Sequence, residues 1–293
     1  MAATSVIRAQ RGQRVRKGLG GLGWGASIAA LVLAIGVLGF VFLFVFVRGV
    51  PALRLSLFTT VTNGVSGGLA NAIAGTFLLV VGAILLTVFV GVGTGIWLAE
   101  YAKGFIGEGL RFLSDVLAGV PSIVVGYFGY ALLVQRLGWH FSLAAGSIAL
   151  ALIMLPYVVR GTDTSLGSVP PALTEASYAL GASRRQTLFQ ITFPYAMPSI
   201  LTSLLLATGI ALGETAPLIY TAGWSNYLPS LALTHSPVGY LTYVIWTFIG
   251  QPFPESHALA YAAAVILMLL IFVTNVVARL VLARISYNLR GGN

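Results

Sequence analysis

Six long apolar stretches constrain this chain more than any other feature of its sequence. Each is comparable to the roughly 20 residues that a helix needs to cross a bilayer. They extend over about Leu22–Val47, Ala70–Ala99, Phe112–Val134, Ser142–Val159, Tyr195–Leu218 and Ala258–Leu282. Only 8% of the residues are charged, against about a quarter in soluble domains, so lipid must solvate much of the surface. The sequence therefore predicts an all-α polytopic membrane protein with six transmembrane helices.

The basic residues predict how these helices are oriented. Five of them precede the first stretch and place the N-terminus in the cytoplasm, because Lys and Arg are retained on that side. With six crossings, the cytoplasmic side then receives every Lys and Arg except three, which are Arg48, Arg54 and Arg136. We therefore expect both termini to be cytoplasmic. The net charge of +9 is explained in this way and does not indicate a nucleic-acid partner.

The stretches also divide the chain. A basic cytoplasmic arm (1–21) precedes the first transmembrane helix and its outer loop (22–69), a permease domain (70–285) and a cytoplasmic tail (286–293). Two connections are too long for simple turns, and they run over about 160–194 and 219–257. The second contains Pro237–Gly250, which is apolar but too short to span. We expect a helix there, at the outer interface or re-entering the bundle, with a plain connecting loop as the alternative.

The connection between the fourth and fifth stretches carries the strongest local pattern. Pro171 suits the first turn of a helix, because a missing N–H costs nothing there. Gly181 stands where glycine can adopt the left-handed conformation that ends a helix. Ser183 and Gln186 have the spacing of a capping box. We predict two short helices that meet at a glycine hinge, the second ending before Pro194, where the fifth span begins.

Small residues on the first of these helices, Ala172, Ala176 and Ala179, permit another surface to approach closely. By this pattern alone, the two helices could dock onto a partner or merely cover the bundle. The segment resembles the EAA loop of ATP-binding-cassette importer permeases, and in that family the loop is a coupling helix that docks into a groove of the ATPase subunit. The resemblance implies an ATPase-coupling role for five residues: Glu175, Ala176, Ser177, Gly181 and Ala182. Ser177 stands where the family often has alanine, a change that we expect to leave packing undisturbed.

Further motifs over about Ala70–Leu282 are similar to those of the PstA family of phosphate-transport permeases. They are Gly119–Gly126, Leu155–Pro156 with Arg160 and Thr162, Val169–Pro170, Ile191–Pro194 and Gly213–Leu218. The resemblance implies a type I (MetI-like) importer permease in the bacterial cytoplasmic (inner) membrane. Such a permease translocates inorganic phosphate by alternating access.

The resemblance also implies the partners. They are a second, PstC-like permease subunit, a PstB-like ATPase dimer that binds ATP and Mg, and an extracytoplasmic, PstS-like phosphate-binding protein. No Walker motif occurs in this chain, so we expect it to be a permease subunit without ATPase activity or a cofactor of its own. The spacing of its histidines and the absence of cysteine predict no metal site.

A glutamate in the fifth stretch is the main candidate for the translocation pathway. Charged residues deep in a membrane helix usually face a pathway or a partner. Glu214 is therefore a candidate together with Thr215, Pro217, Thr208 and, in the third stretch, Ser122; the alternative is that Glu214 snorkels to the outer interface. Many members of the resembled family have an arginine where this chain has Ile210. Since a lone carboxylate repels phosphate, either a partner supplies the cation, or Glu214 is protonated, or the substrate is not phosphate.

Other functions stay open at this point. The chain could transport another oxyanion, such as molybdate, tungstate or a phosphonate, or serve as a scaffold that does not transport. A membrane-embedded enzyme is less favoured, because the sequence shows neither a nucleophile with its base nor a metal-binding motif. Glycines 91, 93 and 95 predict close helix packing rather than a phosphate-binding loop, because no Gly-Lys-Ser/Thr follows.

Overall fold

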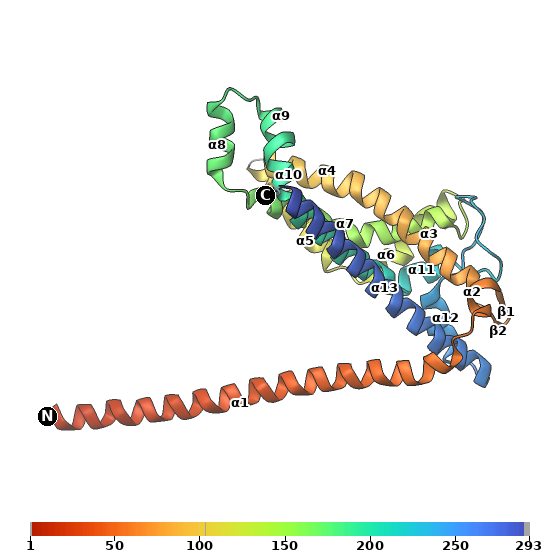
Figure 1. Ribbon diagram of the computed structural model, residues 1–293, viewed down its shortest axis with the longest axis horizontal. Coiled ribbons are helices and arrows are strands. Elements are labelled where there is room, and N and C mark those ends of the chain that lie inside the picture. Colours follow the sequence, from red (N-terminus) through yellow and green to blue (C-terminus); the bar gives the residue numbers. More distant parts are fainter. Residues whose placement is uncertain (1, 103, 290–293) are drawn as a thin grey trace.

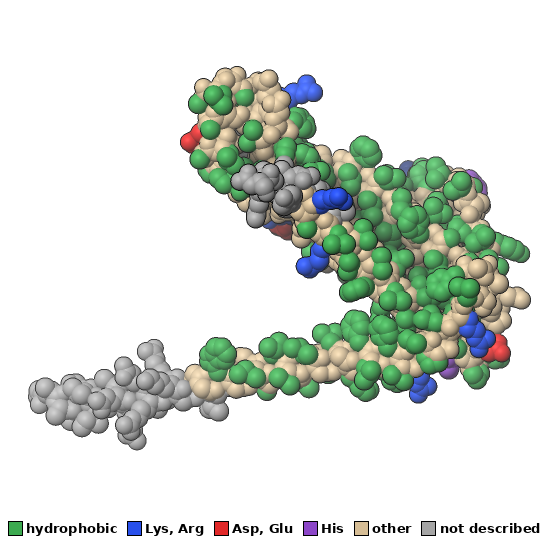
Figure 2. All heavy atoms as spheres, in the orientation of Figure 1, with side chains coloured by type: hydrophobic (Ala, Val, Ile, Leu, Met, Phe, Trp, Pro, Cys, Tyr) green, Lys and Arg blue, Asp and Glu red, His purple; other side chains and the backbone are tan. Residues whose placement is uncertain are grey.

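The computed structural model describes residues 2–102 and 104–289, and most of its regular structure is helical. Among these residues, five helices are long and apolar enough to cross a membrane, and a sixth span is counted if one sharply bent pair is taken together. The five extend over Gly23–Ala52, Ala70–Glu100, Leu143–Gly167, Arg184–Gly213 and Pro254–Arg284. The predicted all-α membrane fold is confirmed. Figure 2 shows hydrophobic side chains over much of the visible face, as expected for a surface solvated by lipid.

The first helix, α1 (Ala2–Gly49), includes the predicted basic arm and the first apolar stretch in one continuous helix. None of its most apolar 18-residue window is buried, and Figure 1 shows α1 leaving the bundle at a wide angle. Near its C-terminal end it meets α13 (Pro254–Leu289), where the rings of Phe44 and Tyr261 pack edge to face at 5.9 Å. An apolar helix with so little internal packing needs lipid or another chain to cover it.

The centre of the bundle is α7 (Leu143–Gly167), which packs against α3 (Ala70–Thr87) and α10 (Phe193–Gly213). Its side chains Leu150, Met154 and Val158 are fully buried. Glycines on α7 bring the neighbouring helices close, since a Cβ atom at Gly161 would meet the Oγ of Ser203 on α10 at 2.1 Å. The core therefore depends on small residues at helix contacts, as is common in membrane bundles.

The glycines of the second span pack as predicted. This span consists of α3, a π-helical turn η2 (Val88–Val92) and α4 (Gly93–Glu100). A Cβ atom at Gly91 would lie 3.1 Å from Val158, and one at Gly95 would lie 2.4 Å from the Cβ of Thr162. A Cβ atom at Gly93 would meet nothing within 4 Å. Two of the three glycines therefore form the contact with α7, and the third lies off it.

The third span, predicted over about Phe112–Val134, is sharply bent in the structure. It consists of α5 (Phe105–Ala118) and α6 (Ser122–Gly129), which are bent by 99°, followed by a π-helical segment η3 (Tyr130–Arg136). Pro121 has no N–H for the helix and takes extended ψ at 132°, so the helix ends at Ala118 and begins again at Ser122. The apolar pattern could indicate the bend at Pro121 but not its angle.

The fifth span begins earlier and ends earlier than predicted. The second loop helix, α9 (Arg184–Thr187), continues through a π-helical turn η4 (Leu188–Thr192) into α10 without a break. The prediction that it ends before Pro194 is wrong, because the proline falls in the first turn of α10 directly after the widened π turn. At the other end the helix stops at Gly213, not at Leu218, and a short helix α11 (Ala216–Thr221) follows.

The remaining elements gather at the end of the bundle opposite α8 and α9 (Figure 1). The apolar segment near residue 240 forms a short helix, as predicted, and Leu241 and Val244 in it are buried. Polar side chains of α3 hold this region, since Thr76 Oγ1 accepts a bond from the Leu241 N–H at 2.9 Å and the Asn71 amide donates to the Ser225 carbonyl at 2.8 Å. The elements are η1 (Val50–Ala52), α2 (Ser56–Thr59), the antiparallel pair β1 (Thr62–Asn63) and β2 (Ser66–Gly67), and α12 (Leu241–Phe248).

Candidate functional site: a projecting helical hairpin and a broken helix

The loop after α7 folds into the two predicted helices. α8 (Pro171–Ala179) begins with the proline, and the chain then turns at Gly181, which has a φ of +79°. Ser183 caps α9, with its hydroxyl accepting from the Gln186 N–H and the Gln186 side chain accepting from the Ser183 N–H. Both the glycine turn and the capping box are thus present. The loop is shorter than the predicted 160–194, because α7 continues to Gly167 and α9 leads into α10.

The hairpin of α8 and α9 projects beyond the bundle (Figure 1). None of the α8 residues is buried, and Glu175, Ala172 and Ala176 are exposed. Leu180, next to the turn, has 89% of its surface exposed. A helix that merely covered the bundle would bury its apolar side against it. α8 therefore does not bury an apolar side against the bundle.

The hairpin is fastened to the second span through Arg184. Its guanidinium donates a hydrogen bond to the Glu100 carbonyl at the end of α4 and lies 3.6 Å from the Glu100 carboxylate. The same guanidinium stacks over the Tyr101 ring at 4.4 Å from its centroid. A cleft of about 470 Å³ lies beside this contact, lined from α8 by Thr174 and Tyr178.

Glu214, predicted to lie within the fifth span, lies instead at the break between α10 and α11. It has an extended backbone, with φ −73° and ψ 134°, and its carbonyl accepts a bond from the Thr242 hydroxyl at 2.8 Å. The Ser122 side chain lies beside its carboxylate. Ser122 is the first residue of α6, which packs directly against α11, since a Cβ atom at Gly126 would lie 2.6 Å from Pro217. The fold therefore brings together two predicted pathway residues from different spans.

The other three pathway candidates have different surroundings. Thr215 is the residue before α11, half-buried, and Pro217 is buried in the first turn of α11. Thr208 is buried on α10, and its hydroxyl donates to the Leu204 carbonyl one turn earlier, at 2.8 Å. Ile210 is also on α10, so the structure has an isoleucine side chain at the position where the resembled family often has arginine. Four of the five candidates thus lie at the break between α10 and α11, namely Glu214, Ser122, Thr215 and Pro217. The fifth, Thr208, lies within α10.

A network of ion pairs joins α5 to α7. Arg111 binds both carboxylate oxygens of Asp163, at 2.7 and 2.9 Å, and donates to the Leu98 carbonyl of α4 at 2.9 Å. Arg160 lies 3.0 Å from Asp115 and 3.6 Å from Asp163. Arg160 is inside α7 rather than in the connection that we predicted to begin at about residue 160. Sequence reasoning missed Asp163, which the i, i+3 spacing from Arg160 could have indicated.

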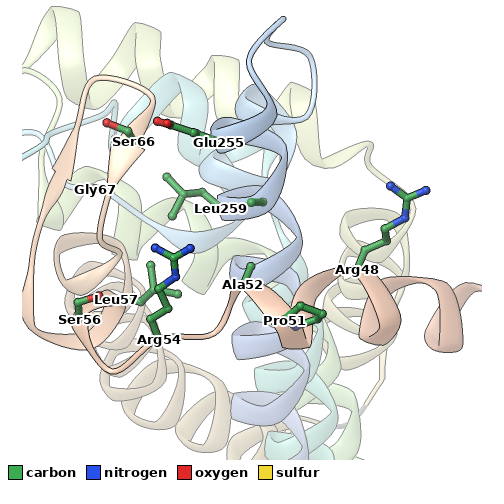
Figure 3. A pocket seen from close by; sticks show the side chains of 11 residues that line it. Arg48, Pro51, Ala52, Arg54, Ser56, Leu57, Ser66, Gly67, Glu255 and Leu259 are labelled. Atoms are coloured by element: carbon green, nitrogen blue, oxygen red, sulfur yellow. The ribbon is translucent and has the colours of Figure 1, made fainter.

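A cavity of about 650 Å³ opens at the end of the bundle opposite the hairpin. Figure 3 shows Arg54 reaching into it from the segment after η1, with Ser66 on the β-hairpin and Glu255 and Leu259 on α13 across from it. The predicted pathway residues lie elsewhere, so the cavity and the helix break are separate features of the chain.

The chain is a polytopic bundle of broken helices with an exposed helical hairpin between two spans. The solved structures support this fold. The chain resembles a subunit of the MetNI methionine ABC transporter in an inward-facing conformation, with a TM-score of 0.59, 16% identity and coverage of 74% of this chain and 95% of the other. An amino acid ABC transporter gives a TM-score of 0.55 at 19% identity, with coverage of 74% and 92%.

The family follows from the sequence comparison. Residues 91–287 match the binding-protein-dependent transport system inner membrane component family, and the chain belongs to it. It is 43% identical over 266 residues to the phosphate transport system permease protein PstA 2 of Mycobacterium bovis, covering 91% of this chain and 88% of the relative. It is 42% identical over 241 residues to PstA of Yersinia pestis, covering 81% of each. This chain is thus an inner-membrane permease component of an ABC importer.

Proposed function

We propose that this chain translocates inorganic phosphate across the bacterial cytoplasmic membrane, with both termini in the cytoplasm. The observation that carries the proposal is the 43% identity to a phosphate transport permease over 91% of the chain. The partners are a second, PstC-like permease subunit, a pair of PstB-like ATPase subunits that bind ATP and Mg, and a PstS-like extracytoplasmic phosphate-binding protein. The chain itself supplies the pathway and the coupling element.

The exposed α8 surface is the part that docks onto the ATPase. Glu175, Ala176 and Ser177 lie on α8, and Gly181 and Ala182 form the turn after it. Small side chains permit close approach, and the absence of buried residues on α8 leaves the whole helix available for a partner. Closure of the ATPases on ATP then displaces the hairpin.

Two connections transmit that displacement. Arg184 fastens the hairpin to the end of α4 through Glu100 and Tyr101. In addition, Arg184–Gly213 forms one uninterrupted helical rod of 30 residues, which spans roughly 45 Å at the α-helical rise. The rod ends at Glu214, so a movement of the hairpin tilts the helix break at the far end. Alternating access follows from rocking of the spans about this rod.

Uptake measurements test the proposed substrate. The gene for this chain is deleted, and uptake of radiolabelled phosphate, molybdate and a phosphonate is compared before and after complementation. Phosphate uptake is expected to fall and to return with the intact gene, while uptake of the other two stays unchanged. Loss of molybdate or phosphonate uptake with phosphate uptake intact would contradict the proposal. Ile210 makes this alternative the one to test, because the chain lacks the arginine of many phosphate permeases at that position.

A further inference from the structure

The ion pairs between α5 and α7 differ in burial and in strength. Asp163 is the well-held carboxylate, with 11% of its side chain exposed and both oxygens bound by Arg111. A bidentate pair of this kind is strong and geometrically fixed. Asp115 is the weakly held carboxylate, with 58% of its side chain exposed and an Arg160 contact at 3.0 Å. Exposed pairs of this kind contribute little, so Arg160 can exchange its partner.

The charges of the four residues also indicate that Arg160 can exchange its partner. Arg111 and Asp163 neutralise each other, and Arg111 is further occupied by the Leu98 carbonyl. Arg160 is left with Asp115 as its close partner and with Asp163 at the longer distance of 3.6 Å. The Arg160 side chain is 39% exposed although it belongs to a membrane-spanning helix. An arginine in such a helix faces water or protein and not lipid. Arg160 therefore presents an exchangeable positive charge at an exposed surface of the bundle.

The bent span of α5 and α6 links Arg160 to the helix break through residues near its two sides. Glu214 contacts Ser122, the first residue of α6. Asp115, in the last turn of α5, is separated from Ser122 by the end of that helix and the bend that follows it. Asp115 then contacts Arg160 on α7. One bent span thus carries both the residue beside Glu214 and the carboxylate that pairs with Arg160.

We propose that Arg160 is a phosphate-binding site on the exit route, and that Asp115 is the internal competitor that releases the anion. This proposal rests on the proposed function. A phosphate that reaches the α5–α7 contact displaces the Asp115 carboxylate and takes a bidentate bond from the guanidinium. When the phosphate leaves for the cytoplasm, Asp115 binds Arg160 again and prevents the anion from returning. The site supplies from α7 the cation that the isoleucine at 210 does not provide.

The test is equilibrium binding of inorganic phosphate to the purified complex of permeases and ATPases without the binding protein. Asp115→Asn removes the competitor, so the dissociation constant for phosphate is expected to decrease about fivefold, the effect of one exposed ion pair. Arg160→Gln is expected to weaken binding by about tenfold or more. The double variant is expected to behave like Arg160→Gln, because Asp115 acts only through the arginine. A purely structural role for the pair gives no variant that tightens binding.

Glu108→Gln is the matched control, since it removes one negative charge from the same helix and leaves the Asp115–Arg160 pair in place. It is expected to bind phosphate as the unmodified complex does. Unchanged binding in Asp115→Asn, or weakening of binding equal to that in Arg160→Gln, would overturn the proposal. If uptake shows that the complex carries another oxyanion, the proposed substrate is wrong, and the same titrations with that oxyanion still decide the role of Arg160.

Discussion

Ser177 on α8 and Thr187 at the end of α9 join their side-chain hydroxyls at 2.9 Å, across the turn at Gly181. This hydrogen bond ties the two arms of the hairpin together. Alanine, which the resembled family often has at this position, could not form the bond. The hairpin is therefore held by one side-chain contact as well as by its backbone turn.

Ser177→Ala is expected to loosen the hairpin and to increase the ATP hydrolysed for each phosphate transported. A hydrogen bond of this kind contributes about 1 kcal/mol, so the change in coupling should be several-fold at most. The ratio of ATP hydrolysis to uptake in proteoliposomes measures it. Thr187→Val should have the same effect, and the double variant should add little to either. Full additivity of the two substitutions would show that the hydroxyls act independently.

Replacing Gly181 with valine is expected to reduce transport by about tenfold or more while membrane insertion stays normal. The strain comes from the backbone, because φ is +79° and a Cβ atom there would meet nothing within 4 Å. A left-handed non-glycine residue costs about 1–2 kcal/mol. Uptake and co-purification of the ATPase are the measurements.

Gly181→Asn serves as the control for that experiment, since asparagine tolerates the left-handed region better than other residues do. It should retain most of the transport. Equal loss in the asparagine and valine variants would mean that side-chain bulk at the docking surface matters and the turn conformation does not.

Gly95→Val is expected to destabilise the bundle by about 1–3 kcal/mol, because the new Cβ would lie 2.4 Å from the Cβ of Thr162 and the helices must separate. Gly93→Val is the matched control two residues earlier, where the space is open. Thermal unfolding of the solubilised protein, followed by size-exclusion chromatography, compares them. If the Gly93→Val variant melts at a lower temperature than the Gly95→Val variant, the assigned contact of Gly95 with α7 is wrong.

Glu214→Gln is expected to reduce phosphate uptake by about tenfold or more without affecting assembly. The glutamine keeps the size of the side chain but cannot carry a negative charge at the helix break. Uptake and co-purification of the partner subunits are both measured. Glu255→Gln, at the distant cavity beside Ser66, is the control for loss of one negative charge. Intact transport in Glu214→Gln would favour the scaffold alternative for this residue.

Sequence patterns predicted the helices of this chain far better than their interruptions. Apolar length identifies a span because it follows from the thickness of the bilayer. The turn at Gly181 and the capping box of Ser183 and Gln186 could also be predicted, because each depends on a local conformational requirement. These features need no knowledge of neighbouring helices.

The geometry of the breaks depends on neighbouring helices, and sequence reasoning could not give it. Pro121, Pro194 and Pro217 all lie in or near spans, yet the chain bends sharply at the first, continues through the second and breaks just before the third. Which outcome occurs depends on contacts such as Thr242 with the Glu214 carbonyl and Gly126 with Pro217. Both contacts join segments far apart in the sequence, so local pattern alone could not reveal them.

Cross-linking of α8 to the ATPase tests the central claim most directly. The chain has no cysteine, so Ala176→Cys introduces a single reactive thiol on the exposed face of α8. Paired with cysteines placed in turn along the ATPase groove, it is expected to form a disulfide whose yield changes when ATP replaces the nucleotide-free state. The control is Val273→Cys, which places a thiol at an exposed position of α13 and should form no disulfide with the ATPase. If α8 is never trapped against the ATPase in any nucleotide condition, the hairpin does not couple ATP hydrolysis to transport.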